Sequence, residues 1–90
     1  MSHQMHTEIA SRTLGLAQRV AASNLKRLDF GADEALSDVG VTSVDLVSLM
    51  LAVEAEFDIM IPASYLNAEN FRSIDTIASM VEKVRAEVSQ

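Results

Sequence analysis

Apolar residues recur at helical rather than alternating spacing along this chain. The clearest stripe lies between positions 43 and 57, where apolar side chains three and four residues apart share one helix face. Its members are Leu46, Leu49, Met50, Val53 and Phe57. Because no stretch alternates apolar and polar residues as a half-buried strand would, the pattern predicts an all-α fold.

Two further stripes predict helices near the ends of the chain. One is expected over about 7–22, although Gly15 disfavours helix and leaves its limits open. The other follows Ser73, a residue type suited to an N-cap. A short helix is expected within 63–71, so the predicted fold is a small four-helix bundle, with three longer helices and one short one. The two terminal faces comprise Ile9, Thr13, Leu16 and Val20, and Ile74, Ile77, Ala78, Val81, Val84 and Val88.

Two segments lack this spacing. Residues 23–40 are rich in Asn, Asp, Ser and Gly and predict a long loop, which apolar anchors would hold in place. Residues 1–6 are polar, and we expect them to be disordered. The 90 residues are then one small domain spanning 1–90. The candidate anchors are Leu25, Leu28, Phe30 and Leu36.

Composition narrows the classes of function. The chain has no cysteine, which excludes a disulfide framework, a thiol nucleophile and a cysteine-based zinc site. No apolar run approaches the roughly 18 residues needed to span a bilayer. The N-terminal sequence also lacks the apolar segment of a secretory signal. These features indicate a cytoplasmic protein without membrane insertion. Separately, we expect a monomer.

The net charge of −6 is unevenly distributed. Residues 1–30 hold four basic and two acidic side chains, whereas residues 31–90 hold three basic and eleven acidic ones. Such acidity repels nucleic acid and favours basic protein surfaces, although it also serves solubility alone. We expect no nucleic-acid partner, and an acidic second helix that attracts basic proteins.

Ser43 lies at the start of the central predicted helix. If it were the N-cap, the third helical position would be Leu46, which cannot return a hydrogen bond to the backbone. With Thr42 as the N-cap, that position is Asp45 and a capping box is complete. Ser43 is then the first helical residue, and a phosphate ester on its hydroxyl would lie beside unpaired N–H groups and the positive end of the helix dipole. The residues alone leave open a structural serine or a modified one.

A longer stretch around this serine resembles the modification-site region of acyl and peptidyl carrier proteins. It runs from Asp38 to Pro62 and reads DVGVTSVDLVSLMLAVEAEFDIMIP. The family pattern is roughly D-x-G-x-D-S-L, a helix, then E-x-x-F and I-x-I-P. The resemblance extends over about 36–84 and includes a segment similar to the family's short third helix. The matching positions are Asp38, Gly40, Ser43, Glu54, Phe57, Ile59, Ile61 and Pro62.

The resemblance implies a covalent cofactor. In this family the serine carries 4′-phosphopantetheine through a phosphodiester, and the terminal thiol of that arm holds acyl groups as thioesters. By resemblance, Ser43 is the attachment residue. The implied partners are a phosphopantetheinyl transferase, an acyl- or aminoacyl-activating ligase and a downstream transferase. A carrier of this kind performs no reaction itself.

Four positions depart from the family pattern. Thr42 replaces the aspartate before the serine, and Val44 replaces the leucine after it. Ser48 and Ala55 replace acids that are common on the second helix of fatty-acid carriers. These changes favour a specialised carrier, for an aminoacyl group or for a secondary pathway, over the housekeeping fatty-acid carrier. Of these, we prefer an aminoacyl carrier.

Candidate partner contacts surround Ser43, and each has a structural alternative. The apolar ones contact the partner and the arm, or else pack at the edge of the core. The acidic ones pair with basic partner side chains, although capping alone explains Asp45. These candidates are Thr42, Val44, Asp45, Val47, Leu51, Glu54 and Ile61.

The alternative function is an unmodified acidic adaptor that binds a basic protein through the same helix. Its partner binding would survive Ser43→Ala. A hydrolase or metal enzyme ranks last, because the chain offers no Ser-His-Asp set and His3 and His6 have no third ligand nearby. We expect neither a catalytic nor a metal site.

Overall fold

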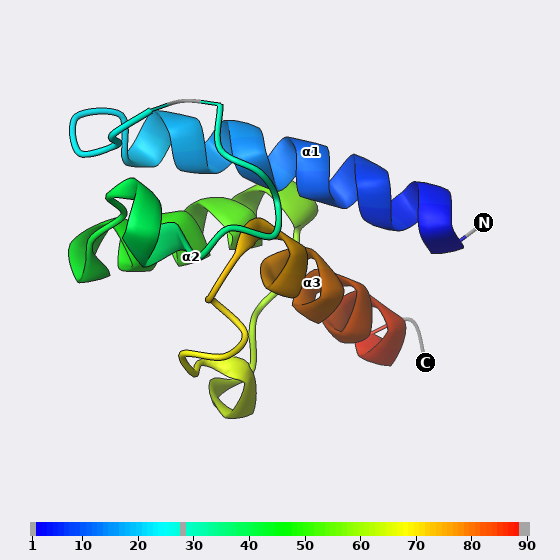
Figure 1. Ribbon diagram of the computed structural model, residues 1–90. Coiled ribbons are helices and arrows are strands. Elements are labelled where there is room, and N and C mark those ends of the chain that lie inside the picture. The colour runs from blue at the N-terminus through cyan, green and yellow to red at the C-terminus, as the bar shows by residue number, and fades with distance from the viewer. Residues whose placement is uncertain (1, 28, 89–90) are drawn as a thin grey trace.

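The computed structural model describes residues 2–27 and 29–88, and the regular elements it contains there are helical (Figure 1). Its α-helices are α1 (Ser2–Val20), α2 (Ser43–Phe57) and α3 (Ile74–Val88). Two 3₁₀ turns, η1 (Leu36–Val39) and η2 (Ala63–Tyr65), lie in the connections. No strand occurs in these described ranges, so the predicted all-α class is confirmed.

The short helix predicted within 63–71 is instead the turn η2 followed by irregular turns. Side-chain amides hold this segment: Asn67 Oδ1 accepts from the Asn70 N–H at 2.8 Å, and Asn70 Nδ2 donates to the Tyr65 carbonyl at 3.0 Å. Local bonds of this kind compete with the helical hydrogen-bond ladder. The predicted count of four helices is therefore not confirmed as such: the described chain has three α-helices, and the short helix expected within 63–71 is the 3₁₀ turn η2 alone.

α1 begins earlier than the apolar spacing indicates. It starts at Ser2 and ends at Val20, where the spacing predicts 7–22. Residues 2–6 are helical, so the expectation of disorder is wrong for them, and position 1 lies outside the described residues. A tertiary contact between His6 and α3 accounts for part of this extension. Because the partners of His6 are distant in the sequence, the spacing of apolar residues within 1–22 does not indicate this contact.

The core lies where α1 packs against both α2 and α3, which do not run parallel to each other (Figure 1). The predicted faces point into it: Ile9, Thr13 and Leu16 of α1 are buried. In α3 the same holds for the predicted face up to Val84, while the side chain of Val88 lies outside the described residues. In α2 the buried members are Leu49, Val53 and Phe57, with Leu46 and Met50 half-buried against the same core.

The long loop after α1 is anchored as expected. Phe30 and Leu36 are buried, and Leu25 packs half-buried against the core. Leu28, the fourth predicted anchor, lies outside the described residues. These contacts hold an otherwise irregular segment against the helices, which is how a long loop persists in a compact fold.

Gly40 lets this loop pass directly beside the start of α2. Its φ of +106° lies in the left-handed region, and a Cβ there would stand 2.3 Å from the Asn24 carbonyl oxygen. Close by, the Lys26 N–H donates to the Val39 carbonyl at 2.9 Å. Only glycine meets both the torsion and the spacing. The first residues of the loop after α1 are therefore held against the turn that leads into α2.

Within the described ranges, none of the helices combines the length and the apolar character required to cross a membrane.

Candidate functional site

The first turn of α2 has the predicted capping box. The Asp45 N–H donates to Thr42 Oγ1 at 3.1 Å, and the Thr42 N–H donates to Asp45 Oδ2 at 3.0 Å. Thr42 has extended backbone torsions, as an N-cap residue should. Ser43 is the first residue of α2, and its side chain is exposed. The placement of Thr42 as N-cap and Ser43 as first helical residue is confirmed.

A second contact fixes this turn to the loop after α1. The carboxylate of Asp45 accepts a hydrogen bond from Asn24 Nδ2 at 2.9 Å, and Asp45 is only 7% exposed. The Thr42 backbone N–H, and then the Asn24 amide, hold the pKa of Asp45 below its usual range, which keeps the carboxylate charged. Sequence reasoning missed Asn24, because a partner 21 residues away leaves no local signal.

Ser43 combines exposure with a fixed position. Its neighbours Thr42 and Asp45 perform the capping, so its hydroxyl is not needed for the helix. The N–H groups at the start of a helix lack acceptors within it, and together with the helix dipole they favour an anionic group there. No described residue accepts or donates a hydrogen bond at this hydroxyl, and a serine without an adjacent base is a weak nucleophile. The described residues therefore supply no base that would activate this hydroxyl.

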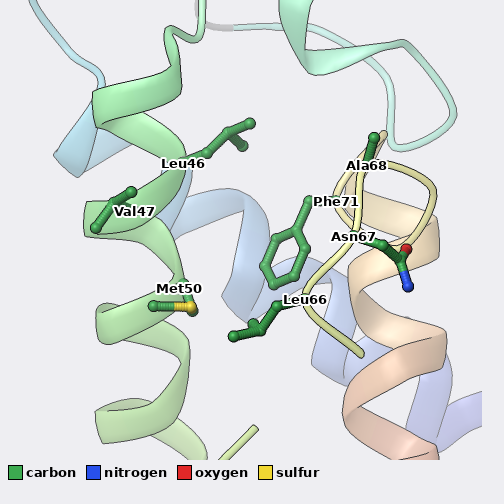
Figure 2. A pocket seen from close by; sticks show the side chains of 7 residues that line it. All are labelled: Leu46, Val47, Met50, Leu66, Asn67, Ala68 and Phe71. Atoms are coloured by element: carbon green, nitrogen blue, oxygen red, sulfur yellow. The ribbon is translucent and has the colours of Figure 1, made fainter. Parts of the chain in front are cut away.

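An apolar pocket of about 260 Å³ begins one helical turn after Ser43 (Figure 2). Leu46 of α2 points across it toward Phe71, whereas Val47 lies on the outer side of the helix at its rim. Positions three and four after Ser43 share its side of the helix, so the pocket adjoins the serine. Its lining comprises Leu46, Val47, Met50, Leu66, Asn67, Ala68 and Phe71.

The candidate partner contacts divide into exposed and buried groups. Val44 is 74%, Val47 55% and Leu51 56% exposed, and Thr42 is exposed as well. Asp45 and Ile61 are buried and offer a partner little surface. Glu54 is half-buried and accepts a hydrogen bond from the Ile61 N–H at 2.9 Å, which ties the end of α2 to the following loop.

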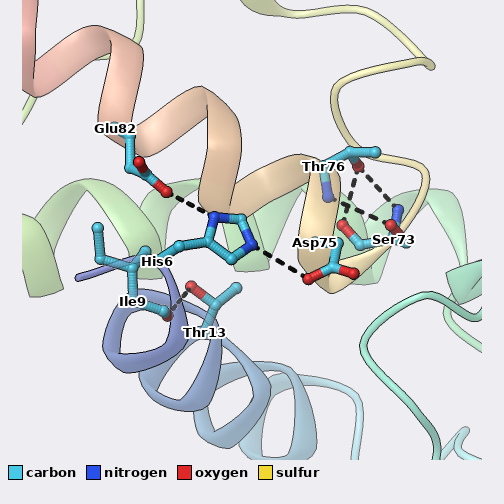
Figure 3. Close-up of polar contacts among 7 residues, drawn as sticks. All are labelled: His6, Ile9, Thr13, Ser73, Asp75, Thr76 and Glu82. Carbon is cyan, nitrogen blue, oxygen red and sulfur yellow. Dashed lines mark hydrogen bonds and ion pairs between the residues drawn. The ribbon is translucent and has the colours of Figure 1, made fainter. Parts of the chain in front are cut away.

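A polar cluster joins α1 to α3 (Figure 3). His6 Nδ1 lies 2.5 Å from Glu82 Oε2, and its Nε2 lies 3.2 Å from Asp75 Oδ1. The hydrogen bond to Asp75, followed by that to Glu82, raises the pKa of His6.

Figure 3 also shows Ser73 capping α3: Ser73 Oγ accepts from the Thr76 N–H at 3.2 Å, which confirms this predicted N-cap.

We expect His6→Gln to lower stability more at about pH 5.5 than at about pH 8.5. The folded-state pKa of His6 is raised, so its stabilising contribution is complete below the unfolded value and is lost as pH rises through the folded value. Urea denaturation of both proteins at the two pH values measures the difference. Equal loss at both would show that the cluster does not depend on the charge of His6.

The chain matches the family model described as "Phosphopantetheine attachment site" over residues 7–84. It is 42% identical over 76 residues to Aminoacyl carrier protein 1 of Bradyrhizobium diazoefficiens, covering 84% of each chain. It is 34% identical over 79 residues to Aminoacyl carrier protein 2 of the same organism, covering 88% of this chain and 89% of that one.

Solved structures agree with these matches. One similar chain comes from the crystal structure of Bradyrhizobium japonicum glycine:[carrier protein] ligase complexed with glycylated carrier protein. It superposes with a TM-score of 0.73 at 39% identity, covering 79% of this chain and 95% of that chain. A second comes from the same ligase complexed with cognate carrier protein and an analogue of glycyl adenylate, with a TM-score of 0.74 at 39% identity. That alignment covers 82% of this chain and 95% of the other.

Proposed function

Because the chain belongs to the phosphopantetheine attachment-site family of carrier proteins, we propose that Ser43 is the residue that bears the cofactor. The protein is a carrier of 4′-phosphopantetheine and not an enzyme. The cofactor supplies a terminal thiol, which this cysteine-free chain lacks, to hold an acyl or aminoacyl group as a thioester. The unmodified adaptor is not favoured.

The position of Ser43 carries this proposal. Its hydroxyl is exposed at the first turn of α2, and the capping residues Thr42 and Asp45 hold that turn without it. The phosphate of the cofactor would lie beside the first-turn N–H groups, where negative charge is favoured. Leu46 and Val47, one turn further on, offer the arm an apolar surface next to its attachment point.

Attachment is a phosphoryl transfer from coenzyme A. Ser43 Oγ forms a bond to the phosphorus of the pantetheine phosphate, while the phosphoanhydride bond breaks and adenosine 3′,5′-bisphosphate leaves. The hydroxyl proton passes to a base of the transferase, because no described residue contacts Ser43 Oγ. This chain contributes the acceptor atom and holds it in a fixed, accessible place.

The cargo we propose is an amino acid, supplied by an amino-acid-activating ligase. The support is the similarity to two aminoacyl carrier proteins and to carriers solved with a glycine:[carrier protein] ligase. A phosphopantetheinyl transferase and a downstream transferase complete the proposed set of partners. We further propose that residues 1–90 form one specialised carrier domain that acts as a cytoplasmic monomer.

The decisive experiment is intact-mass measurement of the apo protein after incubation with coenzyme A and a promiscuous phosphopantetheinyl transferase. The wild-type protein should gain one phosphopantetheine, and Ser43→Ala should gain none. Ser48→Ala is the matched control, because Ser48 is also exposed on α2 but lies beyond its first turn. It should be modified as fully as the wild type.

Two results would contradict the assignment. Modification of Ser43→Ala at the wild-type rate would place the cofactor on another residue. An unchanged mass for the apo wild-type protein, with a transferase that modifies a known carrier in the same tube, would remove the proposed role of Ser43 altogether.

A further inference from the structure

We propose that Asn24 is a positioning residue for the attachment of phosphopantetheine: acting through the carboxylate of Asp45, it holds the turn that presents Ser43 Oγ to the transferase. The proposal rests on the function proposed above, since it concerns the reaction at Ser43. It goes beyond that function by giving a role in the reaction to a residue of the loop after α1, which is distant from the serine in the sequence.

The position of Ser43 is set by its neighbours. Ser43 lies between Thr42 and Asp45, whose capping box closes the first turn of α2 around it. Asp45 Oδ2 accepts the Thr42 N–H at 3.0 Å, so this one atom holds the backbone immediately before the serine. Rotation of the Asp45 carboxylate would therefore release the turn that carries Ser43.

Asn24 is the second donor to that same oxygen atom. Its Nδ2 lies 2.9 Å from Asp45 Oδ2. Two donors that converge on one carboxylate oxygen restrict the orientation of the side chain, and hydrogen bonds to a charged group are stronger than those between neutral groups. Asp45 is only 7% exposed, so water is a poor replacement for a lost donor. The bond from Thr42, followed by that from Asn24, also lowers the pKa of Asp45 and keeps it in the charged form that accepts both.

The backbone of Asn24 is itself held on two sides. Its N–H donates to the Ala21 carbonyl at 2.9 Å, which ties it to the end of α1. Its own carbonyl oxygen lies so near Gly40 that a Cβ at that glycine would stand 2.3 Å away. The short side chain of Asn24 therefore reaches Asp45 from backbone that is fixed relative to both helices.

The exposed position of Asn24 allows two other roles, a direct contact with the transferase and a contribution to overall stability alone. The three roles predict different results. A positioning residue lowers kcat with little change in KM, and its effect disappears when Asp45 is removed. A direct contact with the transferase raises KM and acts independently of Asp45. A bond that only stabilises the fold lowers the melting temperature and leaves the kcat of the folded protein unchanged.

The test follows transfer of phosphopantetheine from coenzyme A by intact mass, with the apo protein as the varied substrate of a promiscuous transferase. Asn24→Ala should lower kcat about fivefold or more and leave the KM for the apo protein within about twofold of the wild type. Asp45→Ala should lower kcat at least as much. In the double variant, Asn24→Ala should lower kcat by less than about twofold further, because its bonding partner is absent.

Ser23→Ala is the matched control for Asn24→Ala. Ser23 is the preceding residue of the same loop and is also exposed. This variant should show the wild-type kcat and KM. Circular dichroism melts establish the temperature at which every variant is folded, and the kinetics are measured below it.

A second measurement does not involve the transferase. Amide hydrogen exchange of the apo protein reports on the two N–H groups of the capping box, those of Thr42 and Asp45. Asn24→Ala should speed their exchange about fivefold or more relative to amides in the middle of α3, because only the turn held by Asn24 opens more often. Ser23→Ala should leave this ratio unchanged.

Four results would overturn the positioning role: a wild-type kcat for Asn24→Ala, a loss that appears in KM instead, single-variant losses that multiply in the double variant, or capping-box amides that exchange no faster. A wild-type protein that gains no phosphopantetheine would count against the proposed function itself. When the wild type is modified, any of the four results counts against the role of Asn24 alone.

Discussion

Gly40→Ala should lower the free energy of unfolding by about 2–5 kcal/mol, most of the stability of a marginal small domain. Two effects add. A non-glycine residue at a φ of +106° is strained, and its Cβ would stand 2.3 Å from the Asn24 carbonyl oxygen. Because this contact is with backbone, relief requires the loop after α1 to move away from the start of α2.

That movement would also disturb the proposed modification site. Gly40 lies three residues before Ser43, and the displaced loop carries Asn24, which bonds to Asp45 of the capping box. We therefore expect slower attachment of phosphopantetheine to Gly40→Ala even where the variant remains folded. Urea denaturation followed by circular dichroism measures the stability, and a time course of intact mass measures the modification.

Gly15→Ala is the matched control, because it makes the same substitution with the opposite expected sign. Gly15 lies within α1, its φ is not in the left-handed region, and a Cβ there meets nothing within 4 Å. Alanine should raise stability by about 0.5–1 kcal/mol through the smaller entropy of its unfolded chain. A Gly40→Ala protein as stable as the wild type would show that the loop approaches α2 less closely than described.

Leu49→Ala should cost about 2–5 kcal/mol of stability. Leu49 is fully buried at the centre of the α2 face that packs in the core. Removing its side chain loses apolar burial and leaves a cavity that the surrounding helices fill only in part. Thermal and urea unfolding measure the loss, and the holo protein should still be charged by a ligase under conditions where it is folded.

Leu51→Ala is the control for this substitution, two residues along the same helix. Leu51 is 56% exposed, so its truncation should change stability by less than about 0.5 kcal/mol. Equal stability losses for the two leucines would mean that α2 is rotated about its axis from the orientation described.

The departures from the family pattern now have a common physical consequence. Thr42 caps α2 through its hydroxyl, as an aspartate could through its carboxylate, but it adds no charge beside Ser43. Ser48 and Ala55 likewise leave uncharged positions on the exposed side of α2. Together they leave uncharged positions on the exposed side of α2, while the capping box at its start is kept.

The sequence alone was enough to locate the buried faces of the three α-helices and the start of α2. Apolar side chains at helical spacing located the buried faces of all three helices, because burial of one stripe is what stabilises a helix in a small domain. The capping box was equally readable, since Thr42 and Asp45 are three residues apart and interact whatever the rest of the chain does.

Features that depend on contacts between residues distant in the sequence were decided by the tertiary structure alone. It extended α1 to Ser2 through the contact of His6 with α3, and it replaced the expected fourth helix by turns. It also decided which acidic side chains of α2 have partners within the protein. Arg12 reaches Glu56, and Asn24 reaches Asp45, only once the chain has folded. Local spacing specifies helices and caps, whereas the availability of a charged side chain depends on neighbours that sequence distance does not reveal.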